Sequence, residues 1–109
     1  MSVEKSNKEN KKFKARFEDK ETGKEKIIHF GDSRYRDYTL LNDKKSKYYI
    51  DNEEKREQVK SLYIKRHMKD LETEAAKTGM TAGALSYYVL WNKPTLSASI
   101  KQYKRIYKL

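Results

Sequence analysis

The sequence of 109 residues contains no cysteine, one proline and four glycines. The absence of cysteine excludes disulfide bonds and thiolate metal ligands, and it permits, without requiring, a reducing compartment. No apolar run approaches the roughly 20 residues that a transmembrane helix needs. Residues 1–10 also lack the apolar core of a signal peptide. The sequence therefore predicts a soluble intracellular protein without a membrane span.

Acidic residues are missing from the last third of the chain, because all 16 of them lie at or before Glu74. Six of the 26 basic residues follow Glu74, and they supply more than half of the net charge of +10. A solvated surface of mixed sign would need acids in this segment too. We therefore favour a surface that faces an anionic partner over one that is merely solvated.

The first part of the chain predicts a β-hairpin that follows a flexible basic tail at residues 1–10. Apolar and basic side chains alternate over residues 11–17, which is the period of a half-buried strand. Gly23 suits the turn, and residues 26–31 form the expected return strand. Residues 32–50 show no clear period, so a third short strand and an ordered loop both remain open. The basic face of the hairpin holds Lys12, Lys14 and Arg16.

The second part of the chain predicts helices. Asp51 or Asn52 can cap a helix that ends near Gly79, and Thr81 can cap a short helix over residues 82–91. Pro94 suits the first turn of a final helix. The apolar stripe of that helix consists of Leu96, Ile100, Tyr103 and Tyr107, and the basic strip beside it consists of Lys101, Lys104, Arg105 and Lys108.

These periods predict an α+β fold, in which an N-terminal β-hairpin or small antiparallel sheet packs on two or three C-terminal helices. Residues 11–109 form a single domain, since the length allows no more than one. Gly31 and Gly83 suit a close approach of two backbones.

No catalytic constellation is visible, so we expect no enzyme and no cofactor. The two histidines, His29 and His67, have no metal-ligand spacing, and we predict no metal site. Whether either histidine is functional stays open. Nucleic-acid binding fits better, because the hairpin face and the final helix both present cations, and the binding should be non-specific and sensitive to salt. Tyrosines that could stack on unpaired bases, if exposed, are Tyr35, Tyr48, Tyr49, Tyr87 and Tyr88.

Several segments together resemble a family of short basic proteins of unknown function that are encoded by nucleocytoplasmic large DNA viruses. The resemblance runs from about Lys11 to Leu109, and it is most specific over residues 81–104. It supplies no activity, so no catalytic residue is carried over. The segments that carry it are residues 29–31 (HFG), 35–39 (YRDYT), 63–67 (YIKRH), 81–86 (TAGALS), 90–94 (LWNKP) and 99–104 (SIKQYK).

The resemblance implies a viral origin and a place in the virion or in a cytoplasmic virus factory. Together with the charge, it predicts a basic structural protein that contacts DNA or the inner virion. The alternative is a minor capsid or scaffold protein whose partner is another protein, such as an acidic viral structural protein. A third reading, an enzyme accessory subunit, also stays open. The oligomeric state stays open.

Overall fold

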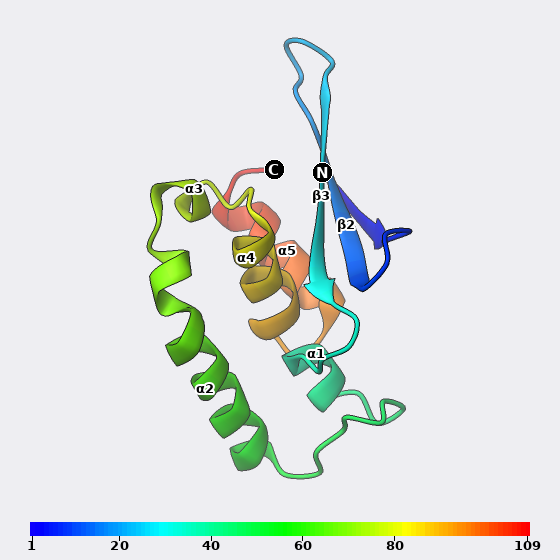
Figure 1. The fold of residues 1–109 in the computed structure, drawn as a ribbon, viewed down its shortest axis with the longest axis vertical. Helices are drawn as coiled ribbons and strands as arrows, with labels where there is room; N and C mark the ends of the chain where they lie inside the picture. The colour runs from blue at the N-terminus through cyan, green and yellow to red at the C-terminus, as the bar shows by residue number, and fades with distance from the viewer.

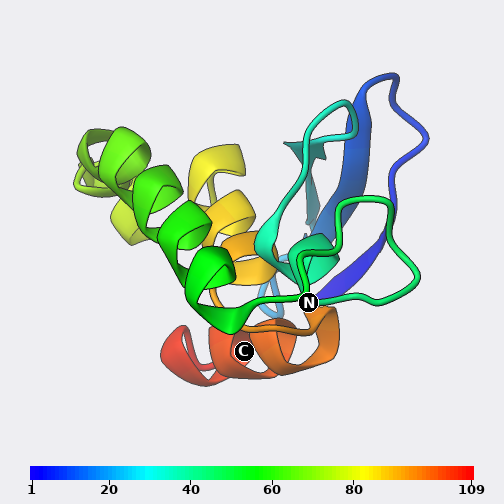
Figure 2. The ribbon, with the colours of Figure 1, turned by 90° about the horizontal axis from the view of Figure 1, so that it is seen from below.

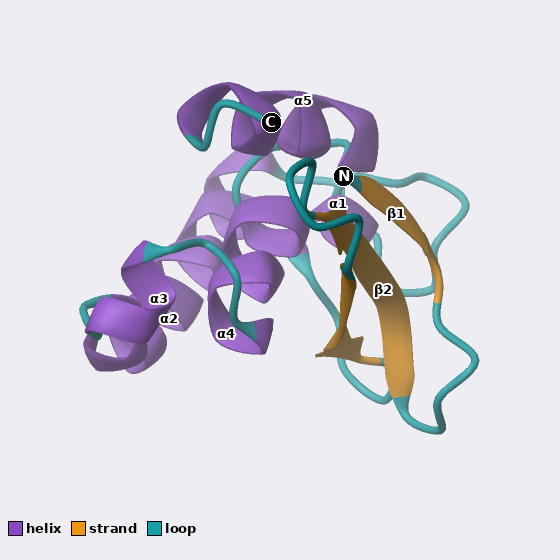
Figure 3. Ribbon diagram, turned by 90° about the horizontal axis from the view of Figure 1, so that it is seen from above, coloured by secondary structure: helices purple, strands orange, loops and turns teal.

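A three-stranded antiparallel sheet opens the chain in the computed structural model, which describes residues 1–109 (Figure 1). Its strands are β1 (Ser2–Lys5), β2 (Lys11–Glu18) and β3 (Glu25–Asp32), in the order β1-β2-β3. Helices follow, and they lie to one side of the sheet in all three views (Figures 1 to 3). The predicted α+β class is therefore confirmed.

Strand β1 occupies part of the segment that the sequence predicted to be a flexible tail, and for residues 2–5 that prediction is wrong. Val3 lies opposite Ala15 in the register of β1 and β2. One inward apolar residue in a four-residue strand leaves no readable period. The strand is held by backbone hydrogen bonds to β2, which the side-chain pattern does not encode.

The β2–β3 hairpin has the predicted faces. Phe13, Ala15 and Phe17 lie on the inner face, and Ala15 is fully buried opposite Ile28. Gly23 has a φ of 71° in the connecting turn, a conformation that glycine adopts without strain. The turn of this hairpin extends beyond the body of the molecule (Figure 1).

Residues 32–50 form an ordered loop that contains one helical turn, α1 (Tyr38–Leu41), and no third hairpin strand. The side chain of Asp37 caps this turn by accepting a hydrogen bond from the backbone N–H of Leu40. Tyr38 and Leu41 are buried. Two buried side chains three positions apart are too few to show a period in the sequence.

Helix α2 (Glu53–Leu71) begins at the predicted cap, where the side chain of Asn52 accepts from the N–H of Lys55. The predicted continuation to Gly79 is wrong, because the chain leaves the helix at Glu72. Thr73 caps a separate short helix, α3 (Glu74–Lys77), by accepting from the N–H of Ala76. A threonine hydroxyl competes for backbone groups in this way, which favours a new cap over a continuous helix.

The predicted helix over residues 82–91 is present and is capped by Thr81, but it has two parts. Its first turn, α4 (Ala82–Leu85), is α-helical, whereas η1 (Ser86–Trp91) is a π-helix. The last helix, α5 (Leu96–Ile106), starts later than predicted. Thr95 is its cap, so Pro94 precedes the helix and does not belong to its first turn.

The core lies where η1 meets the sheet, α1 and α5, and α5 runs behind α4 in Figure 1. Leu90 of η1 lies against Gly31 of β3, where an added Cβ would approach Leu90 Cδ1 to 2.7 Å. A close approach is therefore present at Gly31, but the group that approaches is a side chain and not a second backbone. None of the helices is long and apolar enough to cross a membrane. The ten core residues are Ala15, Phe17, Phe30, Tyr38, Leu41, Leu85, Val89, Leu90, Trp91 and Tyr103.

Candidate functional site

The cations of the outer hairpin face are paired with acids of the neighbouring strands. Arg16 donates to Glu4 of β1 at 3.0 Å and to Glu25 of β3 at 2.9 Å, and Lys14 lies 3.9 Å from Glu4. The hydrogen bond from Arg16 lowers the pKa of the Glu4 carboxyl. Lys14 and Arg16 do share one face, as predicted. Their charges are largely compensated there, which weakens this face as an anion-binding surface.

Lys12 also forms an ion pair within the protein. Its Nζ donates to Asp37 Oδ2 at 2.6 Å, and only 13% of its side chain is exposed. Asp37 is buried, and it also accepts hydrogen bonds from Thr39 Oγ1 and from the N–H of Leu40. Lys12 therefore balances a buried carboxylate that caps α1, which is a structural role.

The four cations at the end of the chain have no acidic partner. We call Lys101, Lys104, Arg105 and Lys108 the α5 cation cluster, and none of them forms an ion pair. Lys101, Lys104 and Arg105 stand at i, i+3 and i+4 of α5, which places them on one side of the helix. Lys108 follows the helix with a φ of 56°. Lys104 is half-buried, whereas the other three are exposed.

Cations in the last turn of a helix also interact favourably with its macrodipole. This applies to Lys104 and Arg105, which lie in the last turn of α5. It does not account for Lys101, one turn earlier, or for the absence of every acid after Glu74. The α5 cation cluster therefore remains the strongest anion-binding surface among the predicted residues.

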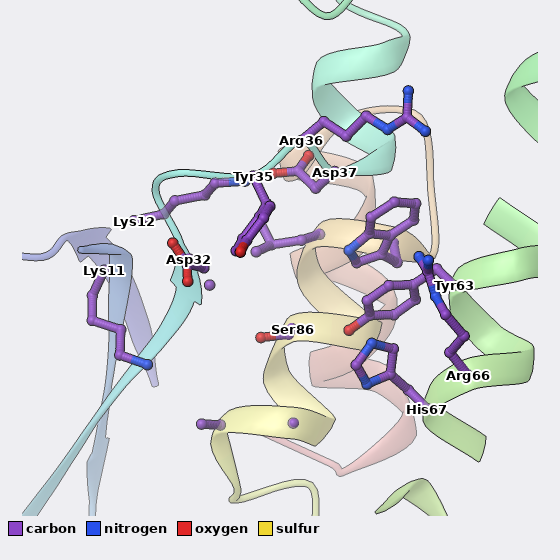
Figure 4. A pocket seen from close by; sticks show the side chains of 15 residues that line it. Lys11, Lys12, Asp32, Tyr35, Arg36, Asp37, Tyr63, Arg66, His67 and Ser86 are labelled. Atoms are coloured by element: carbon purple, nitrogen blue, oxygen red, sulfur yellow. Dashed lines mark hydrogen bonds and ion pairs between the residues drawn. The ribbon is translucent and has the colours of Figure 1, made fainter. Parts of the chain in front are cut away.

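A second region, which the sequence did not reveal, is a cleft of about 630 Å³ between the end of the β2–β3 hairpin, α2 and the α4–η1 segment (Figure 4). The loop before α1 closes one side of it. Its lining residues come from five separate parts of the chain, so no local sequence motif indicates the cleft. The lining residues are Lys11, Lys12, Gly31, Asp32, Tyr35, Arg36, Asp37, Tyr63, Arg66, His67, Ala82, Gly83, Ser86, Leu90 and Trp91.

The cleft carries uncompensated positive charge. Asp32 accepts hydrogen bonds from Arg34, which lower the pKa of its carboxyl to about 2, and Asp37 is paired with Lys12. Lys11, Arg36 and Arg66 form no ion pair. In Figure 4 these three side chains stand on different sides of the cleft. The electrostatic balance therefore favours an anion over a cation.

A rigid aromatic wall forms the α2 side of the cleft. The rings of Tyr63 and Trp91 are stacked, with centroids 4.1 Å apart and planes inclined by 5°. The ring of His67 lies 4.3 Å from that of Tyr63. Burial raises the pKa of Tyr63 to about 12, so its hydroxyl stays protonated at neutral pH. The stacked pair of Tyr63 and Trp91 is thus a neutral, packed surface.

The remaining predicted candidates divide into exposed and packed side chains. Tyr35 has 65% of its surface exposed, whereas Tyr48, Tyr49, Tyr87 and Tyr88 are half-buried. Tyr35 is therefore the tyrosine of this set with most of its ring available for stacking.

The histidines both make local contacts. His29 Nδ1 lies 2.7 Å from Ser6 Oγ, and His67 Nδ1 lies 3.8 Å from Asp70 Oδ2. No group of three histidine or acidic side chains is arranged to hold a metal ion.

Comparison with known proteins gives one match. The family described as "Family of unknown function (DUF5754)" is similar to this chain over residues 1–51. The matched segment contains the sheet and α1, and it stops before α2. It therefore does not cover residues 81–104. No curated protein and no solved structure gives a significant match.

Proposed function

We propose that this chain is a non-enzymatic, virus-encoded basic structural protein that binds nucleic acid through the α5 cation cluster, in the virion or in a cytoplasmic virus factory. One observation carries the binding: these four cations have no acidic partner, whereas the three hairpin cations do. Unpaired cations bind phosphates and release the counterions around them, which supplies most non-specific affinity. The viral origin rests on the sequence resemblance alone.

The proposed contact reads charge and not sequence. Lysine and arginine contacts to phosphates fix the position of a protein on nucleic acid but carry no base information. The cluster is one stripe on one helix and the residues that follow it, and it contains no asparagine or glutamine of the kind that reads adenine. We therefore propose binding that is weak, general and strongly dependent on salt.

The test is a titration of labelled duplex DNA at several salt concentrations, with the binding constant followed by fluorescence anisotropy. We expect log K to fall linearly with log salt, with a slope of about 0.9 for each phosphate neutralised. In the triple variant Lys101→Glu, Lys104→Glu, Lys108→Glu, we expect weaker binding and a slope that is smaller by about 0.9 for each phosphate that is no longer neutralised.

A matched variant separates the cluster from net charge alone. Lys44, Lys45 and Lys55 are exposed in the loop after α1 and at the start of α2 and form no ion pair, so reversing all three changes the net charge by the same amount. We expect this variant to keep its affinity and its slope. Equal losses of affinity in both variants would show that net charge, and not the position of the cations, determines binding. If the unmodified protein does not bind duplex DNA at low salt, the nucleic-acid proposal is wrong and an acidic protein becomes the expected partner.

A further inference from the structure

The cleft beside Tyr35 has the size of a small-molecule site. Its volume of about 630 Å³ lies within the roughly 300–1,000 Å³ of typical ligand pockets. Gly83 contributes to this space, because a Cβ added there would meet no atom within 4 Å. The close backbone approach predicted at Gly83 is therefore wrong, and the glycine opens room inside the cleft instead.

The charged side chains of the cleft select an anion. Lys11, Arg36 and Arg66 reach it from β2, from the loop before α1 and from α2, and none of them has an acidic partner. The two carboxylates of the lining are already satisfied by Arg34 and Lys12. An incoming phosphate would thus meet cations that need no prior ion pair to break.

The apolar side chains of the cleft select a flat ring. Tyr35 is largely exposed at the cleft, and its ring projects into it beside Asp32 (Figure 4). Aromatic side chains with a free face hold unpaired bases by stacking. The stacked pair of Tyr63 and Trp91 gives the opposite wall a fixed shape.

A serine hydroxyl in the cleft is also without a hydrogen-bond partner inside the protein. Ser86 points toward the cleft in Figure 4, and its hydroxyl forms no hydrogen bond, although the residue is only partly exposed. It is the first residue of the π-helix η1, and π-helical segments occur frequently at functional sites. A hydroxyl that can both donate and accept suits the edge of a base.

We propose that this cleft binds one unpaired nucleotide of a nucleic-acid strand, with the base against Tyr35 and the phosphates of the strand against Lys11, Arg36 and Arg66, which stand on different sides of the cleft. This inference rests on the proposed function, since it names the part of the nucleic acid that a second site recognises. A base inside a duplex is already stacked and cannot enter the cleft. The protein therefore holds duplex or strand through the α5 cation cluster and prefers strands with unpaired bases through the cleft.

The single tryptophan makes the cleft observable on its own. Trp91 lines it, so its emission reports occupancy without a label. The probes are thymidine monophosphate, a thymidine oligonucleotide, thymidine and inorganic phosphate. We expect the first two to change the emission with saturation, the oligonucleotide at lower concentration, and the last two to act far more weakly. A preference for the monophosphate over the oligonucleotide would identify a free nucleotide as the ligand. It would contradict the proposal that the cleft binds a nucleotide within a strand.

Gly83→Leu tests the cleft without removing a charge. We expect it to abolish the response of Trp91 to the monophosphate, whereas Gly83→Ala, whose methyl group enters open space, keeps it. Arg66→Gln should lower the affinity roughly tenfold or more, the effect of losing one hydrogen bond to a charged group. Lys65→Gln, which removes a neighbouring exposed cation outside the cleft, should change little. Circular dichroism of each variant verifies its fold.

The α5 variant distinguishes this inference from the proposed function. If the triple Glu variant loses duplex binding but keeps the Trp91 response, both sites stand. If strand binding disappears in the α5 variant and is unchanged in Gly83→Leu, the cleft is not the strand-binding site. The proposed function then remains intact. If Trp91 responds to the monophosphate but the protein binds no duplex DNA, the proposed function is overturned and the cleft remains as a nucleotide site. No response to any of the four probes overturns the cleft.

Discussion

Lys12 Nζ lies 2.6 Å from Asp37 Oδ2, and only 2% of that aspartate side chain is exposed. The pair joins the central strand of the sheet to the cap of α1, two elements that are 25 positions apart in the chain. A buried carboxylate keeps its charge only when donors surround it, and here Lys12 supplies the compensating cation. A residue that the sequence placed on a nucleic-acid surface thus belongs to the internal structure.

We expect Lys12→Ala to destabilise the fold by about 3–5 kcal/mol, because it leaves the buried carboxylate of Asp37 without its cation. Lys14→Ala is the control from the same face of β2. Its partner, Glu4, is half exposed at 3.9 Å, so its loss should cost about 1 kcal/mol or less. Urea denaturation of the three proteins measures both values. Similar losses in the two variants would contradict the structural role of Lys12.

Two glycines with the same backbone conformation should respond differently to alanine. Gly79 has a φ of 76°, and an added Cβ would lie 2.6 Å from Cζ of Tyr107. Gly23 has a φ of 71° with nothing within 4 Å. Gly23→Ala should cost about 1–2 kcal/mol from backbone strain alone, and Gly79→Ala about 1–3 kcal/mol more from overpacking. Thermal unfolding gives the comparison, and equal losses would mean that the Tyr107 ring moves aside freely.

Lys108 adopts a left-handed conformation that glycine adopts without strain. The N–H of Leu109 donates to the carbonyl of Lys104 at 2.8 Å, the bond that ends a helix with a left-handed residue. Lys108→Gly should therefore raise the free energy of unfolding by up to about 1 kcal/mol. Lys101→Gly, inside α5, should lower it by about 1 kcal/mol. Changes of the same sign in both variants would contradict this assignment of the helix end.

Alkaline pH should destabilise the protein through its tyrosines. Burial is the largest cause that raises the pKa values of Tyr38, Tyr63 and Tyr103 to about 12, above the roughly 10 of an unfolded chain. A raised pKa favours the protonated form in the folded state, so this stability is complete below about pH 10 and is lost as the pH rises toward 12. Urea midpoints measured across this range should fall. In Tyr103→Phe the fall should be shallower, and an unchanged slope would contradict the burial effect.

The features that the sequence predicted well are those encoded within one element. The alternation around Ala15 gives the inner face of β2, because side chains of a strand point alternately to its two sides. The stripe of Ile100 and Tyr103 gives the inner face of α5, and both side chains pack in the core. The caps at Asn52 and Thr81 were also found, since a cap needs only its own side chain and an N–H three residues later.

The features that escaped prediction depend on pairs of elements. The compensation of Arg16 requires Glu4, which lies in a strand too short to show a period. The cleft requires Tyr35, Arg66 and Gly83 to meet from three separate segments, and no spacing in the chain relates them. Charge counts could locate the cations of α5, but they could not show which cations elsewhere already had partners.

The core joins two parts of the chain that the family match divides. Ala15, Phe30 and Leu41 lie inside the matched segment, residues 1–51, whereas Leu90 and Tyr103 lie outside it and complete the same cluster. Evolution cannot therefore exchange the matched segment as a self-contained module without supplying a new cover for its apolar face. Covariation between the two parts, with a larger residue at one accommodated by a smaller residue at the other, is the signature that this shared interior should leave in related sequences.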